Sequence, residues 1–302
     1  MPFSANLTLL FHLLFQPQFP NRQSPALQSD FPSPTISGLI KGRDPSFTID
    51  HYRFGDGCDL NIFDDDTCSK KSIPDQSMKQ TSKRNSLRCR LWLWPDRTVP
   101  FKLTVRNPSI IEKFREAIDE LNDLGCITFY QLIDADGINR YIAQRKKYLL
   151  VQEVEPKPGR SCQASLGSIG RRPHLDLSHV CTKGQILHEL MHVLGFAHEH
   201  QRPDRDRYVR IQCEHVMPNV SQDFRRLRQE VISTDLEGDR YDFQSIMHYR
   251  LNHFSIDGHR TIEPVNIDNI RNAGVKEEEI GQMRALSEGD IRRIRKLYQC
   301  HN

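Results

Sequence analysis

Apolar residues recur at helical spacing between residues 109 and 124. Ser109 and Glu112 form a capping-box sequence at the start of this segment, and Gly125 follows it as a stop. The apolar positions are Ile110, Ile111, Phe114, Ala117, Ile118, Leu121 and Leu124. Because they fall three and four residues apart, the pattern predicts an amphipathic helix that buries one face.

A second helix is predicted from about Lys183 to Leu194. Thr182 and Gln185 have the types and spacing of a capping pair at its start. Gly195 ends it, since glycine adopts the left-handed turn that terminates many helices.

A third helix is predicted to start at Ser287, with Asp290 as its capping partner, and to end near Cys300. Its apolar face comprises Ile291, Ile294, Leu297 and Tyr298. The positions between them are basic and predict a solvated face, which comprises Arg292, Arg293, Arg295 and Lys296.

Short apolar and aromatic runs predict strands in the same half of the chain. One is Leu91–Trp94 followed by Val99–Val105, with a proline-marked entry at Pro95. Two more are residues 126–130 and 148–151. By contrast, residues 16–84 are rich in Pro, Ser, Gln, Asp and Lys and show little apolar periodicity, so this stretch is not expected to build a core of its own.

The N-terminus contains an apolar stretch, Leu7–Phe15, which has the length of a signal-peptide core and is far too short to span a bilayer. No basic residue precedes it and no clean cleavage site follows it, so a mis-predicted gene start is the alternative. The polar stretch ends in Lys83-Arg84, which is either a processing site for trypsin-like or furin-like proteases or a solvated charge pair.

Composition narrows the class of protein. The formal net charge of the 302 residues is +3, too small to favour nucleic acid or a membrane surface as a partner. Eight cysteines are widely spaced and form no C-x-x-C pair: Cys58, Cys68, Cys89, Cys126, Cys162, Cys181, Cys213 and Cys300. An even number at such spacing favours disulfides and therefore secretion.

The candidate chemistry lies at the end of the second predicted helix. His188 and His192 are four residues apart, so both imidazoles lie on one helix face within reach of one metal ion. Gly195 permits the chain to turn back, which makes His198 the third candidate ligand. Three histidines and one open position are typical of catalytic zinc, and we expect one Zn²⁺ per chain.

Glu189 follows the first histidine and lies one residue off the ligand face. Zinc lowers the pKa of its bound water to about 7. Glu189 is then the candidate general base, which accepts the proton of the water and passes it to the leaving amine of a peptide.

These residues form the H-E-x-x-H-x-x-G-x-x-H motif, which resembles that of the metzincins. The extension from Gly195 to Asp206 (GFAHEHQRPDRD) is similar to that of the astacin family, and so is Ser245–Tyr249 (SIMHY). The closing segments LSEGDI and LYQC also resemble astacins. The resemblance covers roughly residues 91–300.

The resemblance implies an α+β fold, namely a two-lobed metzincin zinc-protease domain. The upper lobe would hold a twisted mixed sheet and two helices, and the lower, irregular lobe would end in the third helix. It also implies a secreted endopeptidase that cleaves internal bonds of protein or peptide substrates bound in the cleft between the lobes.

The resemblance further implies roles for single residues. Met247 would form an apolar floor under the histidines, and Tyr249 would bind zinc or hydrogen-bond the reaction intermediate. Glu199 would meet the new N-terminus after activation. The remaining nearby histidines are expected to be mostly loop or surface residues: His174, His179, His200, His215, His248, His253 and His259. The charges from Arg202 to Arg207 are expected to form a salt-bridged loop.

The family pattern pairs Cys126 with Cys300 and Cys162 with Cys181. The other four cysteines lie outside that pattern, and Cys58–Cys68 and Cys89–Cys213 are open possibilities. Asn219 begins a glycosylation sequon, which is consistent with secretion.

Astacin pro-segments resemble F-x-G-D, in which the aspartate blocks the zinc. Here Gly55-Asp56 is present, but Phe54 lies one residue too close, so Asp56 is either a blocking residue or part of a turn. We therefore predict a signal peptide in residues 1–20, a pro-segment in 21–84 that an activating protease removes, and an astacin-type catalytic domain in 85–302.

Two alternatives remain at this point. One is a catalytically inactive astacin-like binding module on the same scaffold, against which the intact motif residues argue. The other is a zinc hydrolase that acts on a non-peptide substrate.

Overall fold

The computed structural model describes residues 93–300, apart from 134, 145, 157–160, 169–171 and 228–239. All of these residues belong to one compact unit, Ser46–Asn302. The predicted signal peptide and pro-segment, with Asp56 and Lys83-Arg84, lie outside the described residues.

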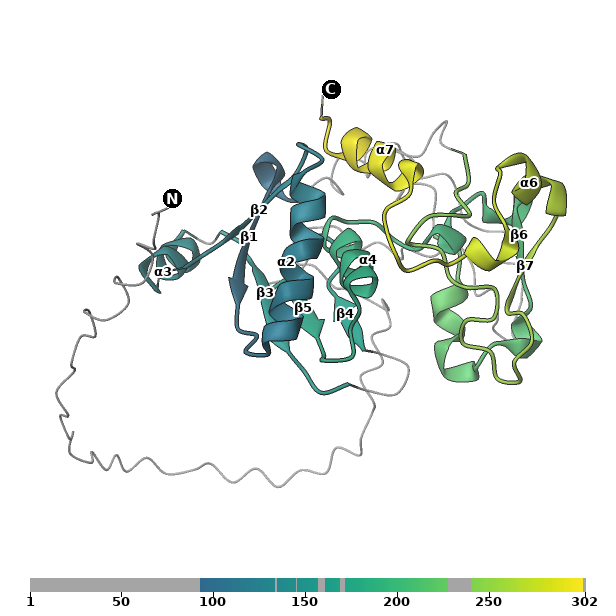
Figure 1. Ribbon diagram of the computed structural model, residues 1–302, viewed down its shortest axis with the longest axis horizontal. Coiled ribbons are helices and arrows are strands. Elements are labelled where there is room, and N and C mark those ends of the chain that lie inside the picture. The colour runs from purple at the N-terminus through teal and green to yellow at the C-terminus, as the bar shows by residue number, and fades with distance from the viewer. Residues whose placement is uncertain are drawn as a thin grey trace, which may run out of the picture. The chain divides into compact units, whose positions relative to one another are not determined.

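A five-stranded mixed sheet organises the first half of the described chain, in the order β2-β1-β3-β5-β4 (Figure 1). The first four strands in this order pair in parallel, and β4 pairs antiparallel with β5 at one edge. The strands are β1 (Thr98–Leu103), β2 (Thr128–Gln131), β3 (Leu149–Glu153), β4 (Cys162–Ala164) and β5 (His174–Leu177). The predicted strands correspond to β1, β2 and β3 within a few residues at their ends, except that Leu93 and Trp94, which were predicted to belong to the first strand, lie outside any strand.

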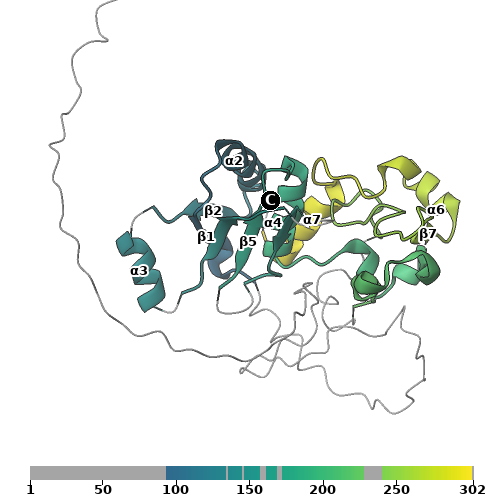
Figure 2. The same ribbon diagram turned by 90° about the horizontal axis from the view of Figure 1, so that it is seen from below.

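Two helices pack beside each other against this sheet: α2 (Pro108–Asn122), which contacts β2, and α4 (Lys183–Val193), which contacts β4 and β5. Figure 2 shows α2 and α4 above and beside the strands. The apolar face predicted for the first helix is buried at Ile110, Phe114 and Leu121. The core that these residues form extends to the apolar side chains of α4.

The predicted start of α2 is wrong in detail. Asn107, not Ser109, caps the helix, because the Asn107 side chain accepts a hydrogen bond from the Ser109 backbone N–H at 3.0 Å. Pro108 then occupies the first helical position, where its fixed φ suits a helix and its missing N–H costs nothing. The capping boxes predicted for α4 and for α7 (Glu288–Leu297) are confirmed.

The second half is less regular and has a separate hydrophobic core, which includes Phe224, Tyr241, Phe243 and Tyr249. Its regular elements are β6 (Val209–Ile211), β7 (Ile262–Pro264) and α6 (Ile267–Asn272). Short 3₁₀ helices cover Pro95–Arg97, Glu199–Gln201, Arg205–Arg207, Cys213–His215, Pro218–Phe224 and Glu277–Glu279. A further helix on the sheet side, α3 (Ala135–Ala143), was not predicted from the sequence.

The closing helix α7 packs Ile294 and Tyr298 into the core of the sheet half. Its predicted solvated face is wrong at one position, because Arg293 is buried. The Arg293 guanidinium forms a two-pronged ion pair with Glu199, at 2.7 and 2.8 Å. This pair ties the last helix to the segment that follows α4.

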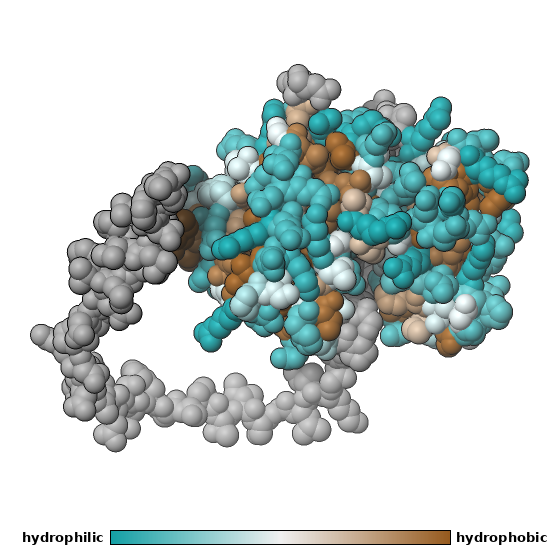
Figure 3. All heavy atoms as spheres, viewed as in Figure 1, coloured by the Kyte–Doolittle hydropathy of each residue, from teal (hydrophilic) through white to brown (hydrophobic). Residues whose placement is uncertain are grey.

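No helix among the described residues is long and apolar enough to cross a membrane. The face shown in Figure 3 is largely hydrophilic, with smaller hydrophobic areas between the polar side chains.

Candidate metal centre and active site

The C-terminal end of α4 carries the candidate site. Gly195 has a φ of +99°, so the helix ends in the left-handed turn that only glycine adopts easily. The indole of Trp94 donates a hydrogen bond to Val193 O at 2.7 Å, and the Tyr298 hydroxyl donates to Leu194 O at 2.9 Å. These bonds satisfy helix-end carbonyls and fix the point from which the chain turns back toward His198.

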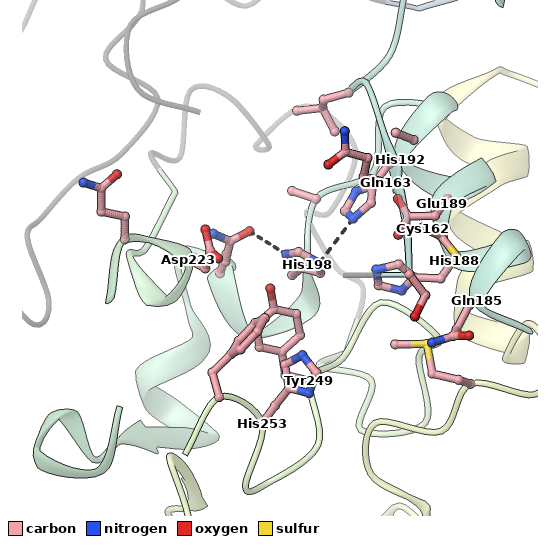
Figure 4. Close-up of a pocket in the computed structure, with 18 of the residues that line it drawn as sticks. Cys162, Gln163, Gln185, His188, Glu189, His192, His198, Asp223, Tyr249 and His253 are labelled. Carbon is pink, nitrogen blue, oxygen red and sulfur yellow. Dashed lines mark hydrogen bonds between the residues drawn. The ribbon is translucent and has the colours of Figure 1, made fainter. Parts of the chain in front are cut away.

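The structure brings the three predicted histidines together. One side-chain nitrogen from each of His188, His192 and His198 lies within 4.8 Å of the others. His188 and His192 project from α4, and His198 faces them from the segment after the turn (Figure 4). Their Nε2 atoms converge, with 3.2 Å between those of His192 and His198.

The outer nitrogen of each imidazole is already used. Nδ1 of His188 donates to Ile246 O and Nδ1 of His192 donates to Phe196 O, both at 2.7 Å. Nδ1 of His198 donates to the Gln201 side-chain oxygen at 3.2 Å. Because Nδ1 carries the hydrogen, Nε2 presents its lone pair inward, as a metal ligand requires.

Burial keeps these imidazoles neutral. Loss of solvent lowers the pKa of His188 to about 4 and that of His192 to about 3. The pKa of His198 lies well below its ordinary value, because of burial and of repulsion from His192 and His188. Neutral nitrogen donors in this number fit zinc.

A pocket of about 230 Å³ lies in front of the three histidines. One wall is formed by β4 and α4, where Glu189 lies half-buried beside His188 and His192. The opposite wall is formed by Gln222, Asp223 and Arg225 and by the segment that contains Tyr249 and His253. The two predicted catalytic residues, Glu189 and Tyr249, therefore border the same pocket as the ligands.

Tyr249 is set among aromatic rings. Its ring centroid lies 4.4 Å from that of His198, 4.1 Å from that of His200 and 4.5 Å from that of His253. Within this group, Nε2 of His200 donates to Asp223 O over 2.9 Å, which holds its ring in place. The phenol is thus fixed beside the candidate metal position.

The sequence comparison decides the family. Residues 87–299 match the sequence profile of the astacin family of peptidases. The chain belongs to the astacin family. A three-histidine zinc site is typical of astacins, and the histidine cluster described above is the counterpart in this chain.

Individual astacins agree with this assignment. The chain is 33% identical over 220 residues to zinc metalloproteinase nas-13 of Caenorhabditis elegans, which covers 72% of this chain and 43% of nas-13. It is 34% identical over 215 residues to human tolloid-like protein 1, which covers 69% of this chain and 19% of that protein. The chain thus spans less than half the length of these two relatives.

A solved astacin structure has the same fold. The hatching enzyme zinc-protease HCE-1 of medaka, Oryzias latipes, matches with a TM-score of 0.55 and 28% identity, over 69% of this chain and 94% of that chain. The predicted α+β astacin fold is confirmed.

The two disulfides expected of an astacin are present. Cys126–Cys300 joins the segment after α2 to the end of α7, with Cα atoms 5.5 Å apart. Cys162–Cys181 joins β4 to the residue before the α4 cap, with Cα atoms 6.1 Å apart. Cys213 is disulfide-bonded as well, and Cys89, which the sequence left as one possible partner, lies outside the described residues.

The astacin turn at Ser245–Tyr249 is held from α7. The buried carboxylate of Asp290 accepts hydrogen bonds from the Ser245 hydroxyl at 2.6 Å and from the Ile246 N–H at 2.9 Å. The same group accepts from the Ser287 N–H in the capping box, at 3.0 Å. Because Ile246 O accepts the hydrogen bond from His188, Asp290 is linked to the metal centre through Ile246 alone.

Replacing Asp290 with alanine is therefore expected to destabilise the fold by about 3 kcal/mol, because two buried donors and the half-buried N–H of Ser287 lose their acceptor. Urea unfolding measures this change. Glu288→Ala is the matched control, since Glu288 is exposed in the same helical turn. Equal midpoints for Asp290→Ala and Glu288→Ala would contradict the assigned role.

Glu199 is buried and its carboxylate has several polar partners. Besides Arg293, its carboxylate accepts from Arg202 at 3.1 Å and from the Asp242 N–H at 2.8 Å. The salt bridges expected between Arg202 and Arg207 are present, from Arg202 to Asp204 at 2.8 Å and from Arg205 to Asp206 at 3.1 Å, and both arginines are buried. Contact between Glu199 and a new N-terminus stays a prediction.

The expectation that most of the other histidines are loop or surface residues does not hold for His200, which lies in the 3₁₀ helix Glu199–Gln201, whereas His248 lies in a loop as expected. Both are fully buried, and the ring of His248 bonds to the Tyr241 hydroxyl at 2.8 Å and to Tyr249 O at 2.6 Å. Their positions in the sequence could have indicated this burial, because His200 and His248 each directly neighbour a residue of the astacin motifs. His215 and His259 agree with the expectation, because neither is buried.

Proposed function

We propose that this chain is a zinc endopeptidase that hydrolyses internal peptide bonds of protein substrates. The observation that carries the proposal is the convergence of three neutral histidines on one wall of a pocket that Glu189 and Tyr249 also border. We assign His188, His192 and His198 as the zinc ligands, with one Zn²⁺ per chain. Zinc held there supplies a Lewis acid that activates water and polarises the carbonyl of the substrate.

Side chains of the protein carry out the proton transfers and stabilise the oxyanion. Glu189 accepts the proton of the attacking water and delivers it to the leaving amine. Tyr249 donates its phenolic hydrogen to the oxyanion that forms on the attacked carbon. Half-burial of Glu189 limits water around the proton transfer, and the rings of His198 and His200 pack against the Tyr249 ring and restrict its movement.

The pocket fits a peptide chain because it lies beside a sheet edge. β4 is the edge strand and supplies Cys162, Gln163 and Ala164 to the pocket wall. An edge strand offers unpaired backbone groups, to which an extended peptide can bond. The class of partner that we propose is therefore an extended segment of a protein or peptide.

The experiment that tests this function is digestion of a defined peptide mixture by the activated chain, with products identified by mass spectrometry. Cleavage at internal bonds that Glu189→Ala does not produce supports the proposal. Zinc binding without cleavage would favour the inactive binding module. Hydrolysis confined to small esters would favour a non-peptide hydrolase.

We further propose that the chain is secreted as a latent precursor that an activating protease cleaves. Support comes from the two disulfides, the leader-like Leu7–Phe15 and the polar stretch that ends at Lys83-Arg84. The proposed boundaries remain 1–20 for the signal peptide, 21–84 for the pro-segment and 85–302 for the catalytic domain. Glycosylation at Asn219, which is exposed, belongs to the same proposal.

Latency gives a prediction. The uncut chain should be inactive until it is cleaved near Lys83-Arg84, Arg88 or Arg90, because a carboxylate such as Asp56 can occupy the open zinc position. Peptide hydrolysis is measured for uncleavable precursors with and without Asp56→Ala. A silent parent with an active Asp56→Ala variant is the expected result. Full activity of the uncut parent would remove the pro-segment proposal.

A further inference from the structure

His253 borders the pocket and has no part in the proposed chemistry so far. It is half-buried, and its ring lies 4.5 Å from the Tyr249 ring and 4.2 Å from the Phe254 ring, measured between centroids. Figure 4 places the imidazole directly beside Tyr249, among the residues that line the pocket. A group bound next to Tyr249 therefore lies within reach of His253.

The backbone at His253 is fixed. Its N–H donates to Arg250 O at 3.0 Å, and its carbonyl accepts from the Thr261 hydroxyl at 2.7 Å. Thr261 is fully buried, so this anchor is protected from solvent. The imidazole thus projects from a rigid position and is preorganised for a ligand.

The ring nitrogens of His253 differ from those of its neighbours. Neither has a hydrogen-bond partner in the described part of the chain, and neither is sealed from the pocket. The rings of His200 and His248, in contrast, bond to Asp223 O and to the Tyr241 hydroxyl. An imidazole at a pocket wall with free hydrogen-bonding capacity is suited to a polar group of a ligand.

The N–H of the ring selects the kind of polar group. A neutral imidazole carries one N–H donor, which pairs with an oxygen acceptor. A carboxylate or amide oxygen of a substrate side chain can accept a hydrogen bond from the imidazole N–H, while the aliphatic stem of that side chain contacts Phe254.

We propose that His253 is a specificity-determining residue, which donates a hydrogen bond to an acceptor-bearing side chain of the substrate beside the scissile bond. The preferred class of substrate therefore has Asp, Glu, Asn or Gln at one position next to the cleaved bond. This inference rests on the proposed peptidase function.

The test compares kcat/KM for pairs of peptides that differ only by Gln or Met, and by Glu or Leu, at each residue flanking the scissile bond. Wild type should favour the acceptor-bearing member about tenfold at one position, the effect of one buried hydrogen bond. His253→Phe keeps a ring against Tyr249 but has no donor, so the preference should fall below about twofold.

His253→Gln retains a donor and should restore part of the preference, a result that a merely structural role would not give. His259→Phe is the matched control, because His259 is exposed and outside the pocket. An unchanged preference in His253→Phe, or no preference in wild type, would overturn this inference alone. Absence of any cleavage by zinc-loaded wild type would overturn the proposed function with it.

Discussion

Replacing His192 with alanine is expected to remove both zinc and peptidase activity. The imidazole of His192 supplies one of three converging nitrogens, and its Nδ1 is held by Phe196 O, so no neighbouring group can take its place without moving the turn at Gly195. Zinc should fall from one per chain to below about a tenth, and kcat/KM by about 10³-fold or more.

Metal content is measured by mass spectrometry after gel filtration, alongside peptide hydrolysis. His259→Ala is the control, because it removes a histidine that is exposed and is not among the residues that line the pocket. Tightly bound zinc at one per chain in His192→Ala would contradict the ligand assignment.

Replacing Glu189 with alanine should leave zinc in place and remove most activity. Glu189 lies beside two ligands but outside the histidine cluster, so the metal should stay bound. Without a proton acceptor for the attacking water, kcat should fall by about 10²–10⁴-fold. Glu189→Gln should behave in the same way, since the amide preserves the shape of the side chain but accepts no proton at neutral pH.

The measurement is kcat by steady-state hydrolysis, with zinc content and thermal unfolding recorded on the same preparations. Loss of zinc together with activity would indicate that Glu189 supports the metal rather than the proton transfer. Turnover near the wild-type value in Glu189→Gln would show that another group is the base.

Local features of the sequence were enough to predict the centre of the site. The capping pair Thr182–Gln185, the four-residue spacing of His188 and His192, and Gly195 each act through neighbours on the same helix or turn. Such short-range rules can be applied without knowledge of the fold. The two astacin disulfides were predicted from family resemblance rather than from geometry.

Other features depend on partners that are distant in sequence. Arg293 lies on the polar side of α7, and its burial is explained by partners distant in sequence, namely Glu199, 94 residues earlier, and Arg240 O. Strands β4 and β5 were not predicted, because their polar residues are more typical of loops. Asp176 is buried in β5, yet it is satisfied by the amides of Gln152 and Gln163 at 2.8 Å each.

The buried histidines illustrate the same limit. His200 and His248 are polar residues in short segments, and periodicity assigns such residues to the surface. Their burial follows from the aromatic cluster around Tyr249, which forms only after residues from 200, 224 and 249 meet. The start of α2 was missed for another reason, since Asn107 and Ser109 are both good caps and Pro108 decides between them.

The central claim is that peptide hydrolysis by this chain depends on one zinc ion held by the three histidines. Its most direct test is to strip zinc from the activated chain with a chelator and to titrate zinc back while peptide cleavage is followed. We predict that cleavage ceases on stripping and returns in full at one zinc per chain. Cleavage that persists in metal-free protein, or that stays absent with one zinc restored, would contradict the account.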